Sequence, residues 1–153
     1  MEHAGVRKTL SPSVKWNLVL RAYSFPASIL PVLATAAAAF TRGADTRWLF
    51  LPPALCVALC FHAGANLAND YYDHLSGADR MNGDVSTWAI SWNLISPART
   101  LFLARCFVAA GLLAGIPLAL ARGPVLLLIG LAGAAGGYFY TAPPVALKRR
   151  GLG

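Results

Sequence analysis

The sequence has few charged residues. Asp, Glu, Lys and Arg together make up 12% of its 153 residues, whereas apolar residues make up 57%. This balance excludes an ordinary soluble domain, in which about a quarter of the residues are charged. Acidic residues are the scarcest, with six against 13 basic ones. Because the basic residues fall between long apolar runs, we interpret them as signals of membrane topology and expect no nucleic-acid partner.

Cysteine is also scarce, and none of the three cysteines has the His/Cys spacing of a zinc site. Cys56 and Cys60 lie one turn apart in one apolar run and Cys106 lies in another, as expected of small buried side chains. The N-terminus lacks the short apolar stretch and cleavage site of a signal peptide. We therefore expect a basic cytoplasmic segment over residues 1–16 and a transmembrane domain over residues 17–153.

Four long apolar stretches each approach the roughly 20 residues that cross a bilayer. The sequence predicts an all-α bundle of about four transmembrane helices, the first interrupted by Pro26 and Pro31. Gly130, Gly133, Gly136 and Gly137 in the last stretch predict close helix packing. Residues 85–95, rich in Trp and aliphatic side chains, are expected to lie along the membrane surface or to cap a cavity. The expected spans are residues 18–40, 48–68, 98–121 and 123–140.

The positions of Lys and Arg predict the orientation of these spans. With the N-terminus in the cytoplasm, only Arg42, Arg47 and Arg122 of the 13 basic residues lie outside. We therefore expect a multi-pass protein of the plasma membrane, the inner membrane in a cell that has two. The basic C-terminal tail and the main group of acidic residues would then share the cytoplasmic side.

The acidic residues gather at the end of the second apolar stretch, where four polar side chains share one helical face at about 100° per residue. Carboxylates cost about 2.5–3.5 kcal/mol each at mid-membrane, so their clustering requires a neutralising partner. Mg²⁺ bound through oxygen ligands meets that requirement and also binds phosphate oxygens, as in a lipid diphosphate. Arg80 or Lys148 would stabilise a departing diphosphate. The four residues are Asn66, Asn69, Asp70 and Asp73.

The same residues allow simpler interpretations. The acidic run can be a solvated helix end followed by a polar loop, although the shared face and the two asparagines argue against it. His62, one turn before Asn66, is either a packing residue with satisfied hydrogen bonds or a functional one. The basic run 148–150 is either a cytoplasmic anchor or part of a ligand site.

The stretch NLANDYYDHLSGADR resembles the first aspartate-rich motif of the UbiA superfamily of intramembrane prenyltransferases. Its Asn-Asp-x-x-Asp core and following Gly-x-Asp are similar to the branch that prenylates 1,4-dihydroxy-2-naphthoate. RAYSFPASILPVL resembles the first helix of that branch, NLISPART the start of its third, and GYFYTAPPVALKRRGLG the Tyr-[Ser/Thr]-x-Pro-Pro segment ending its fourth. The motifs run in family order and resemble the N-terminal half of a UbiA-type nine-helix fold.

The resemblance implies Mg²⁺-dependent transfer of a polyprenyl group from its diphosphate to an aromatic acceptor such as 1,4-dihydroxy-2-naphthoate, in menaquinone biosynthesis. The implied catalytic residues are Asp70, Asp73 and Tyr140. The implied metal ligands are Asn66, Asp70, Asp73 and Asp79. The implied diphosphate-binding residues are Asn66, Asn69, Arg80, Thr141, Arg21 and Lys148.

The family carries a second aspartate-rich motif in its other half, and this sequence has no such motif. We therefore expect little activity from the chain alone and regard the C-terminal half of the fold as a partner. The alternative is a non-catalytic, truncated membrane protein that binds lipid or a partner subunit. A transporter fragment is a third hypothesis, prompted by the prolines of the first span, but the spans lack charges that would mark an ion pathway.

Overall fold

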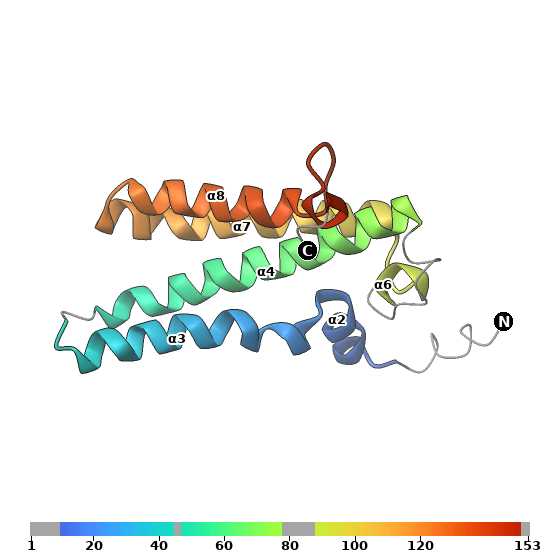
Figure 1. Ribbon diagram of the computed structural model, residues 1–153. Coiled ribbons are helices and arrows are strands. Elements are labelled where there is room, and N and C mark those ends of the chain that lie inside the picture. Colours follow the sequence, from blue (N-terminus) through green and yellow to red (C-terminus); the bar gives the residue numbers. More distant parts are fainter. Residues whose placement is uncertain (1–9, 45–46, 78–87, 151–153) are drawn as a thin grey trace.

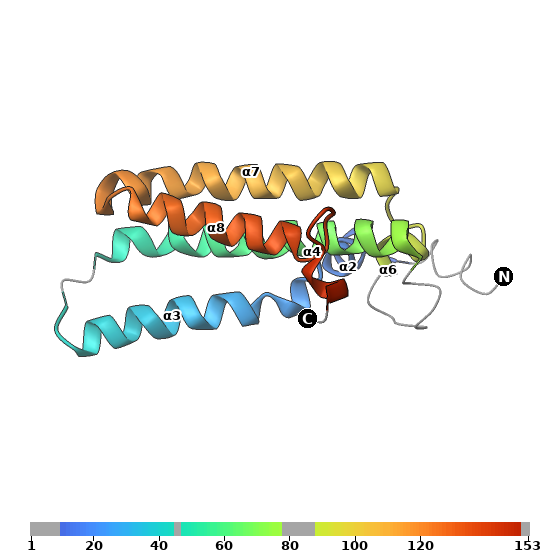
Figure 2. The same ribbon diagram turned by 45° about the horizontal axis from the view of Figure 1, so that its top comes forward.

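The computed structural model describes residues 10–44, 47–77 and 88–150, and every regular element in these ranges is a helix. Four long helices lie side by side (Figures 1 and 2). They are α3 (Pro26–Thr41), α4 (Leu51–Ser76), α7 (Pro97–Arg122) and α8 (Val125–Phe139). The shorter elements are α2 (Pro12–Leu20), η1 (Ala22–Ser24), η2 (Trp48–Phe50), α6 (Trp88–Ser91) and η4 (Leu147–Arg150).

Three helical segments are long and apolar enough to cross a membrane: Ala22–Thr41, Trp48–Ser76 and Pro97–Arg122. The fourth apolar helix, α8, has 15 residues and is shorter than a span. At most 11% of each apolar span is buried within the chain, so most of its surface is available to lipid or further protein. The prediction of an all-α, multi-pass membrane bundle is confirmed, with three full-length spans among the described residues instead of four.

The first apolar stretch is divided by a turn. α2 begins after Ser11, whose hydroxyl caps the helix, and it ends at Arg21 in the left-handed conformation (φ 53°). α3 then begins at Pro26, where a missing N–H costs nothing. The predicted interruption at Pro26 is confirmed, whereas Pro31 lies inside α3 without ending it. α2 also begins within the region that the sequence assigned to the basic N-terminal segment.

The second span is longer than predicted. α4 runs on to Ser76 instead of ending at Ala68, and Gly77 (φ 70°) terminates it in the left-handed conformation that glycine adopts without strain. Asp70 and Asp73 therefore lie within the helix, on the face that the sequence predicts. This fixes them rigidly to a membrane helix.

The segment after the acidic residues enters the protein core. α6 packs against both α2 and α4, and Ala89, Ile90, Leu94 and Ile95 are buried. Of the segment predicted to lie along the membrane or cap a cavity, residues 85–87 lie outside the described ranges. For the rest, one side packs against α2 and α4, whereas Ser91 and Asn93 are exposed. The core cluster that it joins fixes α2 against the C-terminal half of α4.

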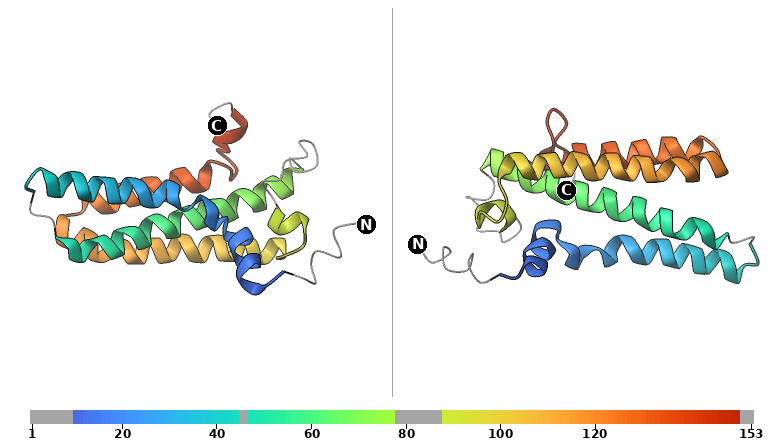
Figure 3. Two further views of the ribbon diagram at one scale, coloured as in Figure 1. Left: turned by 90° about the horizontal axis from the view of Figure 1, so that it is seen from below. Right: turned by 180° about the vertical axis from the view of Figure 1, so that it is seen from behind.

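Glycines set the closest helix contact, between α4 and α7, which lie side by side in Figure 3. A Cβ on Gly64 would lie 2.9 Å from Cγ2 of Val108 and 3.2 Å from the carbonyl oxygen of Ala104. A Cβ on Gly111 would lie 2.6 Å from the ring of Phe61. Such separations are too short for a side chain, so these glycines permit the approach of the two helices.

The glycines of α8 do not have the predicted packing role among the described residues. A Cβ on Gly130, Gly133 or Gly136 would meet no atom within 4 Å, and one on Gly137 would make ordinary contact with Ala65 at 3.5 Å. The spacing therefore marks a face of α8 that no described helix approaches closely. Close packing is a property of α4 and α7.

We expect Gly64→Leu to destabilise the bundle by about 1–3 kcal/mol, because the new side chain would have to push α7 away. The matched change Gly133→Leu has free space and should alter stability by less than about 0.5 kcal/mol. Unfolding of both variants by sodium dodecyl sulfate in mixed micelles, followed by circular dichroism, measures the difference. Equal destabilisation by the two leucines would contradict the assigned contact.

Candidate functional site

The last turns of α4 carry two buried carboxylates. Asp70 is 1% exposed and Asp73 is 5% exposed, while Asn66 and Asn69 beside them are partly buried. Burying a carboxylate without a partner costs several kcal/mol even after relaxation. The surrounding chain must therefore supply positive charge, and it does so from two distant segments.

Arg21 supplies the charge at Asp70. Its Nη2 donates a hydrogen bond to Oδ1 of Asp70 in an ion pair whose side chains are 15% and 1% exposed. Arg21 is the left-handed residue between α2 and η1, and its N–H donates to the carbonyls of Asn17 and Leu18. This conformation costs a non-glycine residue about 1–2 kcal/mol. The strained turn thus carries the guanidinium that reaches α4.

Lys148 supplies the charge at Asp73. Its Nζ lies 2.8 Å from Oδ2 of Asp73 and 3.4 Å from Oδ1 of Asn69. The amide nitrogen of Asn69 donates to the same Asp73 oxygen at 2.8 Å. The C-terminal segment therefore docks on the acidic face of α4. Both segments predicted to lie on the cytoplasmic side meet at one end of the bundle.

A second polar group lies deeper along α4. Asn66 donates from Nδ2 to Oγ of Ser24 at 3.3 Å and to the carbonyl of Leu20 at 3.4 Å. His62 lies between two hydroxyls, with Nε2 2.8 Å from Ser24 Oγ and Nδ1 2.6 Å from Ser28 Oγ. The two serines were not selected from the sequence. The four-residue spacing of Ser24 and Ser28 is the sequence feature that could have indicated them, because it places both hydroxyls on one face, opposite His62.

The predicted pair Tyr140 and Thr141 follows α8 directly. A hydrogen bond of 2.8 Å between the hydroxyls of Tyr72 and Tyr138 ties the end of α8 to α4. Thr141 is 3% exposed, and its hydroxyl makes no hydrogen bond with the described residues. Tyr140 is partly buried, and its carbonyl accepts a hydrogen bond from Lys148 N at 2.9 Å. Two of the predicted site residues, Asp79 and Arg80, lie outside the described ranges.

The donor set is one of oxygen ligands. In the described part of the chain, no group of three His, Cys, Asp or Glu side chains lies close enough together to hold a metal. The two carboxylates and two amides of α4 nevertheless fit Mg²⁺, which uses one or two protein carboxylates and completes its shell with water and substrate phosphates. The residues present thus fit Mg²⁺ bound together with a phosphate ligand.

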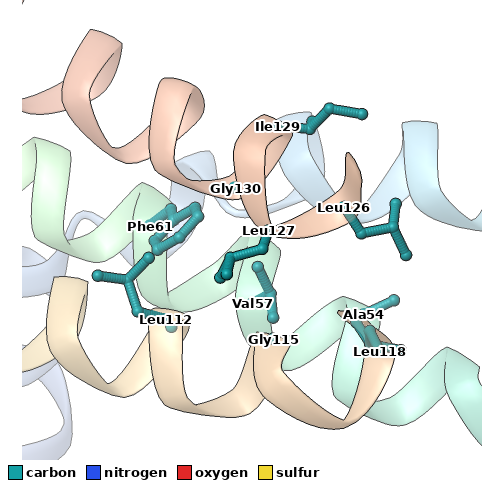
Figure 4. Close-up of a pocket in the computed structure, with 11 residues that line it drawn as sticks. Ala54, Val57, Phe61, Leu112, Gly115, Leu118, Leu126, Leu127, Ile129 and Gly130 are labelled. Atoms are coloured by element: carbon teal, nitrogen blue, oxygen red, sulfur yellow. The ribbon is translucent and has the colours of Figure 1, made fainter. Parts of the chain in front are cut away.

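An apolar pocket of about 200 Å³ lies between α4, α7 and α8, away from the carboxylates (Figure 4). Phe61, Leu112 and Leu127 line it together with the small residues Gly115 and Gly130. The pocket carries no charged side chain and opens among membrane helices. It can accommodate an apolar chain, whereas the side chains that could bind an anionic group lie at the end of α4.

Comparison with known proteins gives a consistent set of relatives. The family model described as the UbiA prenyltransferase family matches residues 28–153. A 1,4-dihydroxy-2-naphthoate octaprenyltransferase of Mycobacterium tuberculosis is 36% identical over 83% of this chain and 43% of its own length. Proteins of the same name from Mycobacterium leprae and Bacillus subtilis are 30% and 33% identical over 91% and 88% of this chain.

The match to these relatives is partial in one respect. The chain spans about half the length of the curated relatives it matches, 43%, 47% and 42% for the three proteins. A shorter match of 36% identity covers 46% of this chain and 20% of a UbiA prenyltransferase domain-containing protein of Xenopus tropicalis. No solved structure matches the chain.

The two ion pairs should differ in energy because they differ in burial. We expect a double-mutant cycle of Arg21→Met and Asp70→Asn to give a coupling of about 1.5–3 kcal/mol. The same cycle for Lys148→Met and Asp73→Asn should give less than about 1 kcal/mol, since the Lys148 side chain is 40% exposed. Unfolding in mixed micelles provides the four free energies of each cycle. A larger coupling energy for Lys148 and Asp73 than for Arg21 and Asp70 would contradict this prediction.

Proposed function

The chain belongs to the UbiA prenyltransferase family, and from this premise we propose that it forms the diphosphate-binding half of a membrane prenyltransferase. The observation that supports this most is the pair of buried carboxylates, Asp70 and Asp73, held with Arg21 and Lys148 at one end of apolar helices. The proposed reaction transfers a polyprenyl group from its diphosphate to an aromatic acceptor such as 1,4-dihydroxy-2-naphthoate. That acceptor is the one named for the relatives of similar sequence.

We assign metal binding to the oxygens of Asn66, Asp70 and Asp73, with Asp79 as a further ligand. Mg²⁺ bound there would add positive charge beside a diphosphate leaving group. Asn66 suits this role because its amide nitrogen is used by Ser24 and Leu20, while Oδ1 accepts no hydrogen bond from the described residues. The carboxylates supply the negative charge that the metal requires.

The diphosphate would be bound by the cationic and polar groups around the carboxylates. Arg21 and Lys148 are within reach because each already contacts one of the two aspartates, and Arg80 is proposed as a third cation. Asn69 and the buried Thr141 hydroxyl, which is without a hydrogen-bond partner in the described part of the chain, are the uncharged donors. These groups hold the diphosphate in the orientation that its departure requires.

The chemical step breaks the allylic carbon–oxygen bond, and the electron pair leaves on the diphosphate. Arg21 and Lys148 stabilise the negative charge that develops there. An electron-rich ring carbon of the acceptor then attacks the allylic cation and forms the carbon–carbon bond. The same ring carbon then loses its proton, or its carboxyl group as carbon dioxide and a proton, and the electron pair of the broken bond restores the aromatic ring. Tyr140 is proposed to lie beside the reacting carbon, where the face of its ring would stabilise the cation.

We also propose that the carboxylate end faces the cytoplasm of a plasma, or inner, membrane. With that orientation most Lys and Arg residues are cytoplasmic, as the positive-inside rule requires. Arg21 and Lys148 come from opposite ends of the chain, and both contact the carboxylates of α4 at that end. A water-soluble acceptor ring and a diphosphate headgroup would then both reach the site from the cytoplasm, while the polyprenyl tail remains among the helices.

Asparagine in place of either aspartate should remove most of the transfer. We expect Asp70→Asn and Asp73→Asn each to lower Mg²⁺-dependent transfer by about 100-fold or more, because each removes a negative ligand. The assay uses a chimaera in which this chain replaces the matching part of the Mycobacterium tuberculosis relative, with a polyprenyl diphosphate, 1,4-dihydroxy-2-naphthoate and Mg²⁺. Asp45→Asn, in the connection between α3 and α4, is the matched control and should retain activity.

Unchanged transfer in both aspartate variants would refute the site. The chain alone, assayed in the same way, should give little product, because it spans about half of its relatives. A folded chimaera without any activity would favour the alternative of a non-catalytic membrane protein that binds lipid or a partner subunit.

The ion pairs of the free chain predict a coupling between metal and diphosphate. Each aspartate already has a protein cation, so a divalent cation arriving alone increases repulsion. Lys148→Met should therefore strengthen Mn²⁺ binding without diphosphate by about 3–10-fold, as expected for loss of one partly exposed charge. It should weaken binding of inorganic diphosphate with Mn²⁺. Electron paramagnetic resonance measures the concentration of free Mn²⁺.

The control is Arg150→Met, because the Arg150 guanidinium contacts the Pro144 carbonyl and neither aspartate. Weaker Mn²⁺ binding by Lys148→Met in the absence of diphosphate would exclude this coupling.

A further inference from the structure

The turn that carries Arg21 and the amide of Asn66 share one hydroxyl group, that of Ser24. Its oxygen lies 2.7 Å from the carbonyl of Arg21, 3.3 Å from Nδ2 of Asn66 and 2.8 Å from Nε2 of His62. A hydroxyl has one hydrogen to donate and two lone pairs that accept. These three contacts therefore use the whole capacity of the Ser24 hydroxyl.

The direction of each hydrogen bond follows from the partners. The Arg21 carbonyl can only accept, so the Ser24 hydrogen points to it. Ser24 Oγ must then accept from Asn66 Nδ2 and from His62 Nε2, which requires that Nε2 carries the proton. In a neutral imidazole Nδ1 is then the acceptor and takes the hydrogen of Ser28 at 2.6 Å. The ring is also held edge-on by Phe25, with centroids 5.5 Å apart.

Two residues of the proposed diphosphate site depend on this arrangement. Asn66 presents its nitrogen to Ser24 and so leaves Oδ1 as the atom available to a cation. Arg21 is held by its carbonyl in the turn from which its guanidinium reaches Asp70. His62 itself precedes Asp70 by about 12 Å along the helix axis, at 1.5 Å per residue, and lies deeper among the membrane helices.

We propose that His62 is a positioning residue for this site. As a neutral ring protonated on Nε2, it fixes Ser24 as a hydrogen-bond acceptor, which orients the Asn66 oxygen as a cation ligand and holds the Arg21 turn. The role at the site rests on the proposed function, whereas the tautomer and the orientation of Asn66 do not. His62 would therefore do more than pack against its neighbours, although it does not contact the reacting atoms.

Two substitutions of His62 test whether the site needs a hydrogen-bond donor at the position of Nε2 or only a polar side chain. Glutamine places an amide N–H near the position of Nε2 and can still donate to Ser24, whereas asparagine reaches only the position of Nδ1. His62→Gln should retain the arrangement, and His62→Asn should lose it although both are polar amides. Circular dichroism in bilayers confirms that both variants are helical before they are compared.

The first readout is nitrogen NMR of the chain labelled in histidine and asparagine in lipid bilayers, with the His62→Gln spectrum subtracted to isolate the His62 signals. We expect a protonated Nε2 and an unprotonated Nδ1, and a shifted Asn66 side-chain amide signal in His62→Asn but not in His62→Gln. A ring protonated on Nδ1, or equal shifts of Asn66 in the two variants, would overturn the proposal.

The second readout is the affinity for Mn²⁺ in the presence of inorganic diphosphate. We expect His62→Asn to weaken it by about tenfold, the equivalent of one hydrogen bond to the site, and His62→Gln to stay within about twofold of the unmodified chain. Equal losses in both variants count against a positioning role. If no variant and no unmodified chain binds Mn²⁺, the proposed function fails, and the NMR result alone decides the role of His62.

Discussion

The structure depends on the burial of two carboxylates at the end of a membrane helix. Asp70 and Asp73 are nearly inaccessible, and leaving such charges unpaired would cost several kcal/mol each. Cations must therefore be brought to α4 from elsewhere in the chain. Arg21 comes from 49 residues before and Lys148 from 75 residues after their partners. The turn at the end of α2 and the docked C-terminal segment are consequences of that requirement.

The apolar part of the bundle holds the carboxylates of α4 in a fixed position. Lipid chains are as apolar as leucine, so helices in a membrane associate through close packing and polar contacts. α4 meets α7 through Gly64 and Gly111, and it meets the first span through the hydrogen bonds of His62. α4 is thus fixed on two sides below the carboxylates. A rigid platform keeps Asn66, Asp70 and Asp73 in one line on the helix, which a loop would not do.

The sequence predicted the acidic face because helical periodicity is local. It did not predict the partners of the aspartates, since a separation of 49 or 75 residues leaves no local signal for an ion pair. It also ended the second span at Ala68, because polar residues after an apolar run are usually exposed; here α4 continues to Ser76 with Asp70 and Asp73 buried. The glycines of α8 show the same limit, because spacing reveals a small-residue face but not whether another helix lies against it.

The charge balance of the free chain bears on which ligand the proposed site selects. Counting the described residues, each aspartate is paired with a cation, and a metal or a diphosphate arriving alone would add strong charge to this group. A metal and a diphosphate together restore the balance, so the two should bind as a unit by reciprocal coupling. Below the carboxylates most of the surface of the apolar spans is not buried within the chain, so an apolar tail would have hydrophobic surface to contact. Under the proposed function, preference for a metal-bound diphosphate head would follow from the pairing of buried charges at the boundary between water and membrane, before any contact with the reacting carbon is considered.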